Sequence, residues 1–124
     1  MVAVRQILVI DPDEKMSELF VQLFELEGYG VTAVESLAEA MARLSESRFD
    51  LIITEALDQQ DPFNFDPAFL TRLRSTANTP IILCSTAPSC DYLRASDFGL
   101  AAVVPKPFDI DRLLGNMRQA LDRH

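Results

Sequence analysis

The sequence is poor in cysteine and in basic residues, and it has no apolar run of the ~20 residues that span a membrane. Its two cysteines, Cys84 and Cys90, lack the number and spacing of a disulfide framework or a zinc site. A net charge of −8 repels nucleic acid and anionic membranes, and the N-terminus has no signal-peptide pattern. We therefore expect a cytoplasmic protein with two reduced thiols that binds neither nucleic acid nor membrane.

Internal repeats, low-complexity tracts and Gly/Ser linkers are also absent. A chain of 124 residues can bury one core but is too short to hold a second domain beside it. We expect a single domain over residues 1–124 with no output domain. Its effect would then pass through another protein.

Apolar strands alternate with amphipathic helices from one end of the chain to the other. The clearest helix is 13–27, where apolar residues recur at i, i+3, i+4, i+7 and i+8. Further helices are predicted over 67–76 and after the expected N-caps Ser36 and Asp109. The helix predicted at 89–98 has the weakest apolar stripe. The predicted strands are 7–10, 31–34, 49–54, 81–84 and 101–104.

This alternation predicts an α/β fold with a parallel sheet between two layers of helices. Pro105 ends the fifth strand and lacks an N–H group, which favours an edge position for that strand. Right-handed crossovers then give a flavodoxin-like (βα)5 three-layer sandwich with strand order 2-1-3-4-5. In such a sheet the working crevice lies beyond the carboxyl ends of the strands.

Four of these strands end in a polar residue, in the order acid, acid, hydroxyl and lysine. The residues are Asp11, Glu55, Ser85 and Lys106, and the last begins the sequence Lys106-Pro107-Phe108. In this pattern the chain resembles the receiver domain of response regulators, the phosphoacceptor module of two-component signalling. The resemblance places Glu55 at the phosphoacceptor position and Asp11 in the acidic pocket that binds Mg²⁺. It places Ser85 and Lys106 at the switch and phosphate-contact positions, with Ser85 as the switch hydroxyl. It also implies a cis Lys106–Pro107 bond.

Three positions depart from the family pattern. Pro12 replaces the second acidic residue of the metal-binding pair, so only Asp11 remains as an expected ligand. We assign Asp13 to the acidic pocket together with Asp11, but it lies one residue too late to replace the lost ligand without reversing its facing. We therefore expect a weak or absent Mg²⁺ site. Glu55 replaces the usual aspartate and is expected to reach towards Lys106 as an ion pair. The position of the switch aromatic is occupied by Val103.

The segment after Glu55 is a loop rich in phenylalanine and acids. Phe63, Phe65 and Phe69 favour core packing, with a partner-binding patch as the alternative. The carboxylates at 58, 61 and 66 are interpreted as turn and cap residues without a metal role.

Three hypotheses from different classes remain open. The first is a degenerate receiver, not an enzyme, that binds a histidine kinase, a phosphotransfer protein or a downstream regulator without being phosphorylated. The surface that contacts the partner would consist of residues 89–98, the fifth strand and the last helix. The same surface could also form a homodimer. Ala101 and Ala102, however, replace an acidic pair that the family uses in one such dimer. The second is a working phosphoacceptor that uses Asp11, Asp13 or Glu55, or a constitutively active form with Glu55 as phosphate mimic. The third is a small enzyme or flavin carrier, which the acidic turn after the first strand disfavours.

Overall fold

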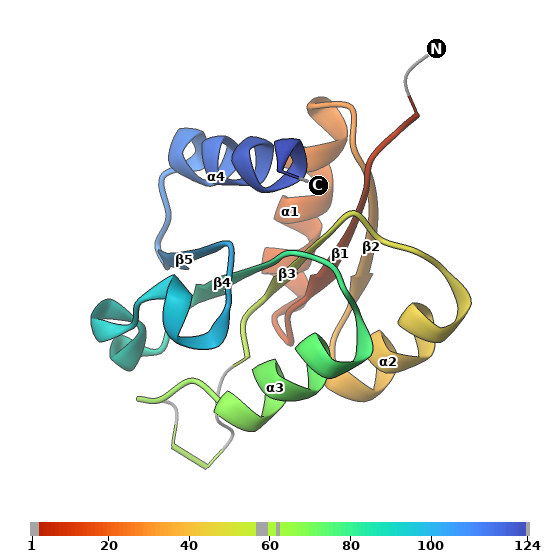
Figure 1. The fold of residues 1–124 in the computed structure, drawn as a ribbon. Coiled ribbons are helices and arrows are strands. Elements are labelled where there is room, and N and C mark those ends of the chain that lie inside the picture. The colour runs from red at the N-terminus through yellow and green to blue at the C-terminus, as the bar shows by residue number, and fades with distance from the viewer. Residues whose placement is uncertain (1–2, 57–59, 62, 124) are drawn as a thin grey trace.

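The computed structural model describes residues 3–56, 60–61 and 63–123, and it contains one parallel five-stranded sheet (Figure 1). The strands are β1 (Gln6–Ile10), β2 (Gly30–Val34), β3 (Leu51–Thr54), β4 (Ile81–Ser85) and β5 (Ala102–Pro105). Their order is β2-β1-β3-β4-β5, as the sequence predicts, and β5 lies at an edge. The helices are α1 (Glu14–Leu26), α2 (Leu37–Glu46), α3 (Pro67–Thr76) and α4 (Ile110–Asp122).

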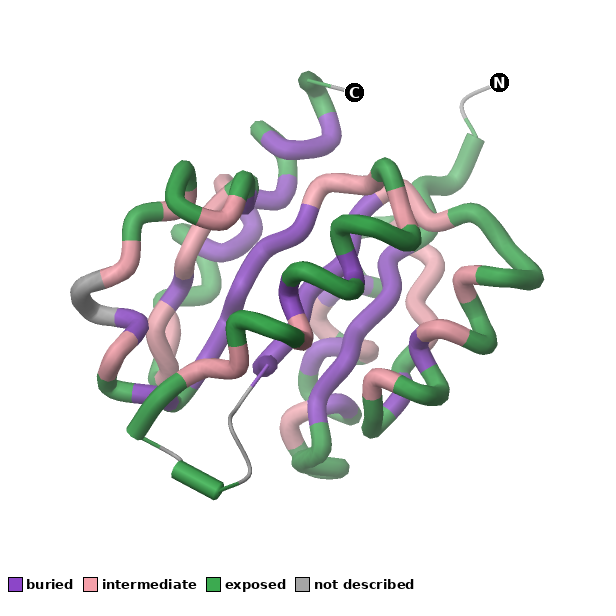
Figure 2. Tube along the Cα trace, turned by 60° about the horizontal axis from the view of Figure 1, so that its bottom comes forward, coloured by how far each residue is buried: buried purple, intermediate pink, exposed green. Residues whose placement is uncertain are grey.

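The helices cover the sheet on both sides, and two apolar cores result. One core joins the sheet to α1 and α4 through residues such as Phe20, Phe24 and Met117. The other joins it to α2 and α3 through residues such as Leu70 and Leu73. Figure 2 shows the central strands buried along their length, with helices that are buried only on their inner side. The continuous apolar sequence of these strands therefore reflects burial on both faces.

A polar side chain begins each of the four helices. Ser36 and Asp109 cap α2 and α4 as predicted, and Asp13 and Asp66 cap α1 and α3 by accepting hydrogen bonds from first-turn N–H groups. No helix among the described residues is both long and apolar enough to cross a membrane.

The prediction of a helix at 89–98 is wrong. The chain forms two short 3-10 helices there, η1 (Pro88–Tyr92) and η2 (Ala95–Phe98), and Gly99 ends the second in a left-handed conformation. The segment has too few apolar residues to bury one side of a full α-helix, and such helices depend on that burial for stability. Phe98 instead packs edge-on against Phe65, and Arg74 donates a hydrogen bond to the Phe98 carbonyl.

The phenylalanines that follow β3 divide between core and surface. Phe65 and Phe69 pack against the core on the α2 and α3 side, which agrees with the prediction. Phe63 is 55% exposed. Asp61 accepts hydrogen bonds within its own turn and Asp66 caps α3, as predicted, whereas Asp58 lies outside the described residues.

Candidate functional site

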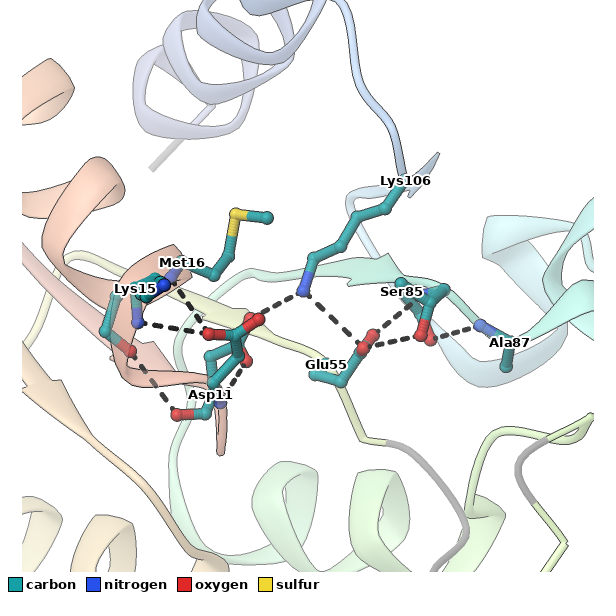
Figure 3. Close-up of polar contacts among 10 residues, drawn as sticks. Asp11, Lys15, Met16, Glu55, Ser85, Ala87 and Lys106 are labelled. Atoms are coloured by element: carbon teal, nitrogen blue, oxygen red, sulfur yellow. Dashed lines mark hydrogen bonds and ion pairs between the residues drawn. The ribbon is translucent and has the colours of Figure 1, made fainter.

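The fold brings the four predicted site residues to the carboxyl edge of the sheet (Figure 3). Asp11 and Glu55 follow directly after β1 and β3, which are neighbours with Ile10 opposite Thr54. Ser85 is the last residue of β4, and Lys106 follows β5. Figure 3 shows the Lys106 side chain reaching between the two carboxylates. Asp11, Glu55 and Ser85 are all buried.

Lys106 forms ion pairs with both carboxylates, but at different distances. Its Nζ lies 2.6 Å from Asp11 Oδ2 and 3.5 Å from Glu55 Oε1. The pair predicted with Glu55 is therefore present, and Asp11 is the closer partner. Burial alone would lower the pKa of Lys106, but the hydrogen bond to Asp11 and the charges of Asp11 and Glu55 outweigh it and raise that pKa. Lys106 is accordingly a charged lysine held between two acids.

Asp11 has a partner at each carboxylate oxygen. Oδ2 accepts the hydrogen bond from Lys106, and Oδ1 accepts one from the backbone N–H of Asp13 at 2.9 Å. The Ser17 hydroxyl donates to the Asp11 carbonyl at 3.3 Å. These contacts tie the end of β1 to the first turns of α1.

Glu55 is bound by Thr86, a residue that the sequence did not single out. The Thr86 N–H donates to Glu55 Oε2 at 3.0 Å, and the Thr86 hydroxyl donates to Oε1 at 2.9 Å. Ser85, the predicted switch residue, instead accepts a hydrogen bond from the N–H of Ala87 at 3.1 Å. The hydroxyl that holds Glu55 thus belongs to the residue after Ser85.

The oxygen donors of the described pocket residues do not fit a magnesium ion. Mg²⁺ requires near-octahedral oxygen ligands, but Asp11 uses its carboxylate on Lys106 and on a backbone N–H. Pro12 is exposed and offers no side-chain oxygen. Asp13, which the sequence placed in the acidic pocket, is exposed and caps α1 through hydrogen bonds from Lys15 and Met16. No group of three acidic, histidine or cysteine residues among those described could hold a metal.

An aromatic stack forms the wall behind the lysine. Phe108 stacks on Phe20 with ring centroids 5.4 Å apart, and Phe20 stacks on Phe24 at 5.3 Å. Lys106 Nζ lies 5.9 Å from the centre of the Phe20 ring. The Lys106–Pro107 bond is cis, as the resemblance implies. This Lys-Pro-Phe segment thereby places the charge against an apolar surface, where ion pairing is screened less than in water.

Comparison with known proteins gives consistent results. The family model of the response regulator receiver domain matches residues 7–118. The chain is 33% identical over 117 residues to the uncharacterized transcriptional regulatory protein YkoG of Bacillus subtilis, and 30% identical over 119 residues to the transcriptional regulatory protein CpxR of Escherichia coli K12. These matches cover 93% and 95% of this chain but 50% of each relative, so the chain spans about half the length of the curated relatives it matches.

Solved structures agree on the fold. The receiver domain of the Francisella response regulator 1452 superposes with a TM-score of 0.80 at 26% identity, over 96% of this chain and 98% of that one. The signal receiver domain of an HD domain-containing protein from Pseudomonas fluorescens Pf-5 superposes with a TM-score of 0.84 at 24% identity, over 99% and 90% of the two chains. The strand order, the polar residues at the strand ends and these matches show that the chain belongs to the response regulator receiver domain family.

Proposed function

We propose that this receiver domain signals by a protein contact that does not depend on phosphorylation of its pocket. The observation that supports this is the state of Glu55. Its carboxylate is buried, both of its oxygens accept hydrogen bonds from Thr86, and Lys106 lies 3.5 Å away. Phosphoryl transfer requires an oxygen that a donor can approach in line. Hydrogen bonds to both oxygens oppose that approach.

The other two carboxylates offer no better nucleophile. Asp11 is neutralised by Lys106, and Asp13 is exposed and caps α1. A phosphoacceptor relocated to either residue would give up a contact that stabilises the fold. We therefore favour the phosphorylation-independent module over the hypothesis of a relocated phosphoacceptor.

Intact mass after incubation with acetyl phosphate and Mg²⁺ tests this proposal. We expect no gain of a phosphoryl group under conditions that phosphorylate a receiver with an aspartate at the acceptor position. A stable gain would contradict the proposal. The variants Asp11→Asn, Asp13→Asn and Glu55→Gln would then identify the acceptor.

A second function, constitutive signalling, is favoured by the same contacts. Glu55 lies between Lys106 and Thr86, and Thr86 directly follows Ser85. The family resemblance assigns Lys106 and Ser85 to phosphoryl binding, so Glu55 contacts one of these residues and the neighbour of the other. A carboxylate that makes both contacts would hold the domain in its activated arrangement. Under this alternative Glu55 is required for the output, whereas under the first proposal its charge is irrelevant.

The proposed partner is a histidine kinase, a phosphotransfer protein or a downstream regulator, met in the cytoplasm. The proposed contact surface consists of η1, η2, β5 and α4, where a homodimer would also form. We do not propose that residues 1–124 contact DNA, because their net charge of −8 repels phosphates. We propose a binding role for them and no catalytic one. The output function would lie outside these residues.

Affinity capture from the source organism separates the two functions. Wild-type protein and a folded Glu55→Ala variant would serve as baits, with mass spectrometry to identify bound regulators. Equal capture supports the phosphorylation-independent contact. Capture by the wild type alone supports the phosphate mimic.

A further inference from the structure

A groove of about 360 Å³ lies between α1 and the end of β2, and the proposed function uses none of its residues. Val21 and Ala33 are among its apolar lining residues. Three glutamates, Glu14, Glu18 and Glu35, line it as well, and the described lining residues include no lysine or arginine. The groove is therefore partly apolar and carries charge of one sign.

The end of β2 lines this groove, and the outer edge of the strand has backbone groups without a hydrogen-bond partner among the described residues. β2 is an edge strand that pairs only with β1 among the described strands. Gly30 donates to the Arg5 carbonyl, and the Val34 carbonyl accepts from Asp11, so alternate residues of β2 are turned towards β1. Strand alternation then directs the N–H and C=O groups of Val31 and Ala33 to the open edge. Such an edge is a template for another strand.

The three glutamates are not neutralised by neighbours in the described part of the chain. All three are exposed, and none takes part in an ion pair there. Near the end of β2 the Glu35 N–H is occupied, because it donates to Glu39 Oε2 at 2.9 Å. The open part of the edge is consequently short, and its borders are acidic.

We propose that this groove binds an extended segment of a partner protein with lysine or arginine at alternate positions, which adds to the sheet as a sixth strand beside β2. Backbone hydrogen bonds to Val31 and Ala33 would align the segment, and side chains on its α1 side would meet Glu14 and Glu18. A second copy of the chain fits less well, because it would bring two sets of glutamates together. Nucleic acid is repelled by the same charges.

Binding of a short fluorescent peptide of alternating lysine and threonine provides the first test. A peptide of alternating glutamate and threonine should not bind, and one with proline at every second position should bind weakly because it lacks the N–H donors. We expect the double variant Glu14→Gln/Glu18→Gln to weaken binding roughly tenfold. The matched control is Glu25→Gln/Glu46→Gln, which removes the same charge from exposed residues of α1 and α2 outside the groove and should change binding by less than about twofold.

Amide hydrogen exchange with the lysine peptide tests the strand geometry. The Val31 and Ala33 amides should exchange quickly in the free protein and slow when the peptide binds, whereas Thr32, turned towards β1, should be protected throughout. The proposal is overturned if the peptide does not bind, if both double variants weaken binding equally, or if the two amides are unaffected. Self-association that disappears in the groove variant alone would overturn it in favour of a second copy. Circular dichroism of each variant checks that it is folded.

Discussion

Asp11 and Glu55 end neighbouring strands and are buried at the same edge of the sheet, yet different kinds of partner hold them. Asp11 is held mainly by charge, through a 2.6 Å contact with Lys106. Glu55 is held mainly by two hydrogen bonds from Thr86, and its distance to Lys106 is 3.5 Å. The pocket thus has an electrostatic half that joins β1 to the end of β5, and a hydrogen-bonded half that joins β3 to the end of β4.

The difference shows that two buried carboxylates at one sheet edge can be held by different partners. The longer side chain of Glu55 reaches the residue after Ser85 and satisfies its carboxylate there. Lys106 is then left to neutralise Asp11, which has lost its acidic neighbour to Pro12. Both carboxylates have protein partners, and each half can be tested separately.

The largest expected effect comes from restoring aspartate at both altered pocket positions, 12 and 55. The variant Pro12→Asp/Glu55→Asp should bind Mg²⁺ and gain a phosphoryl group from acetyl phosphate, because it restores a ligand oxygen and withdraws the second carboxylate from Thr86. Amide NMR during a Mg²⁺ titration and intact mass would measure this. The control Pro12→Ala/Glu55→Asp lacks the ligand oxygen and should bind Mg²⁺ poorly. A folded double variant that stays inert would show that these two positions did not silence the chemistry.

Next in size is the loss of charge in the electrostatic half. Asp11→Asn should lower the free energy of unfolding by about 2–4 kcal/mol, because it leaves the buried Lys106 without its closest counter-charge. Asp13→Asn makes the same chemical change at an exposed helix cap, where asparagine caps nearly as well, and should cost under about 0.5 kcal/mol. Urea unfolding would measure both. Equal losses would mean that the ion pair does not stabilise the fold.

The hydrogen-bonded half should show a smaller, pairwise effect. In a double-mutant cycle, Glu55→Ala and Thr86→Val should couple by about 1 kcal/mol, since the two side chains share a hydrogen bond that either change removes. The matched cycle with Ser85→Ala should show little coupling, because the Ser85 hydroxyl pairs with the Ala87 N–H. Stronger coupling of Glu55 to Ser85 than to Thr86 would contradict Thr86 as the residue that holds the carboxylate.

The smallest effect is a change with pH. The pKa of Lys106 is raised above its ordinary value of 10.5 in the folded protein, so the stability it contributes is complete below pH 10.5 and is lost as the pH rises through the folded pKa. The difference in unfolding free energy between wild type and Asp11→Asn should therefore be constant at neutral pH and shrink above pH 10.5. A difference that grows with pH would contradict the charged state of the pair.

Most of the fold follows from apolar periodicity, and the exception has a physical cause. The helix over 13–27 was predictable because its apolar stripe meets a large core at Phe20 and Phe24. The segment 89–98 lies between two strands in a position where an α-helix is expected, but its composition cannot bury a helical face. The segment forms two 3-10 helices. At the end of the second helix, Phe98 contacts Arg74 of α3 through a hydrogen bond and Phe65 through its ring. Those contacts are distant in sequence and leave no local signal.

The site was predictable in position but not in pairing. Parallel strands bring their carboxyl ends to one edge, so the meeting of Asp11, Glu55, Ser85 and Lys106 follows from the strand order. Lys106 lies closer to Asp11 than to Glu55, and this preference depends on the lengths and conformations of the three side chains. Thr86 was missed because an exposed hydroxyl after a strand resembles a turn residue. Thr86 reaches the carboxylate because the Glu55 side chain is long. The glutamate at position 55 was therefore the one feature of the sequence that could have indicated the role of Thr86.

Cys84 lies one residue before the end of β4 and is almost fully buried, and its burial raises the pKa of its thiol to about 12. Alkylating reagents react with the thiolate, so they should modify this cysteine only when β4 separates from its neighbours. In a Cys90→Ala background, the alkylation rate would then report how often the centre of the sheet opens. Because Cys84 directly precedes Ser85, the native chain carries its own chemical probe of motion beneath the pocket.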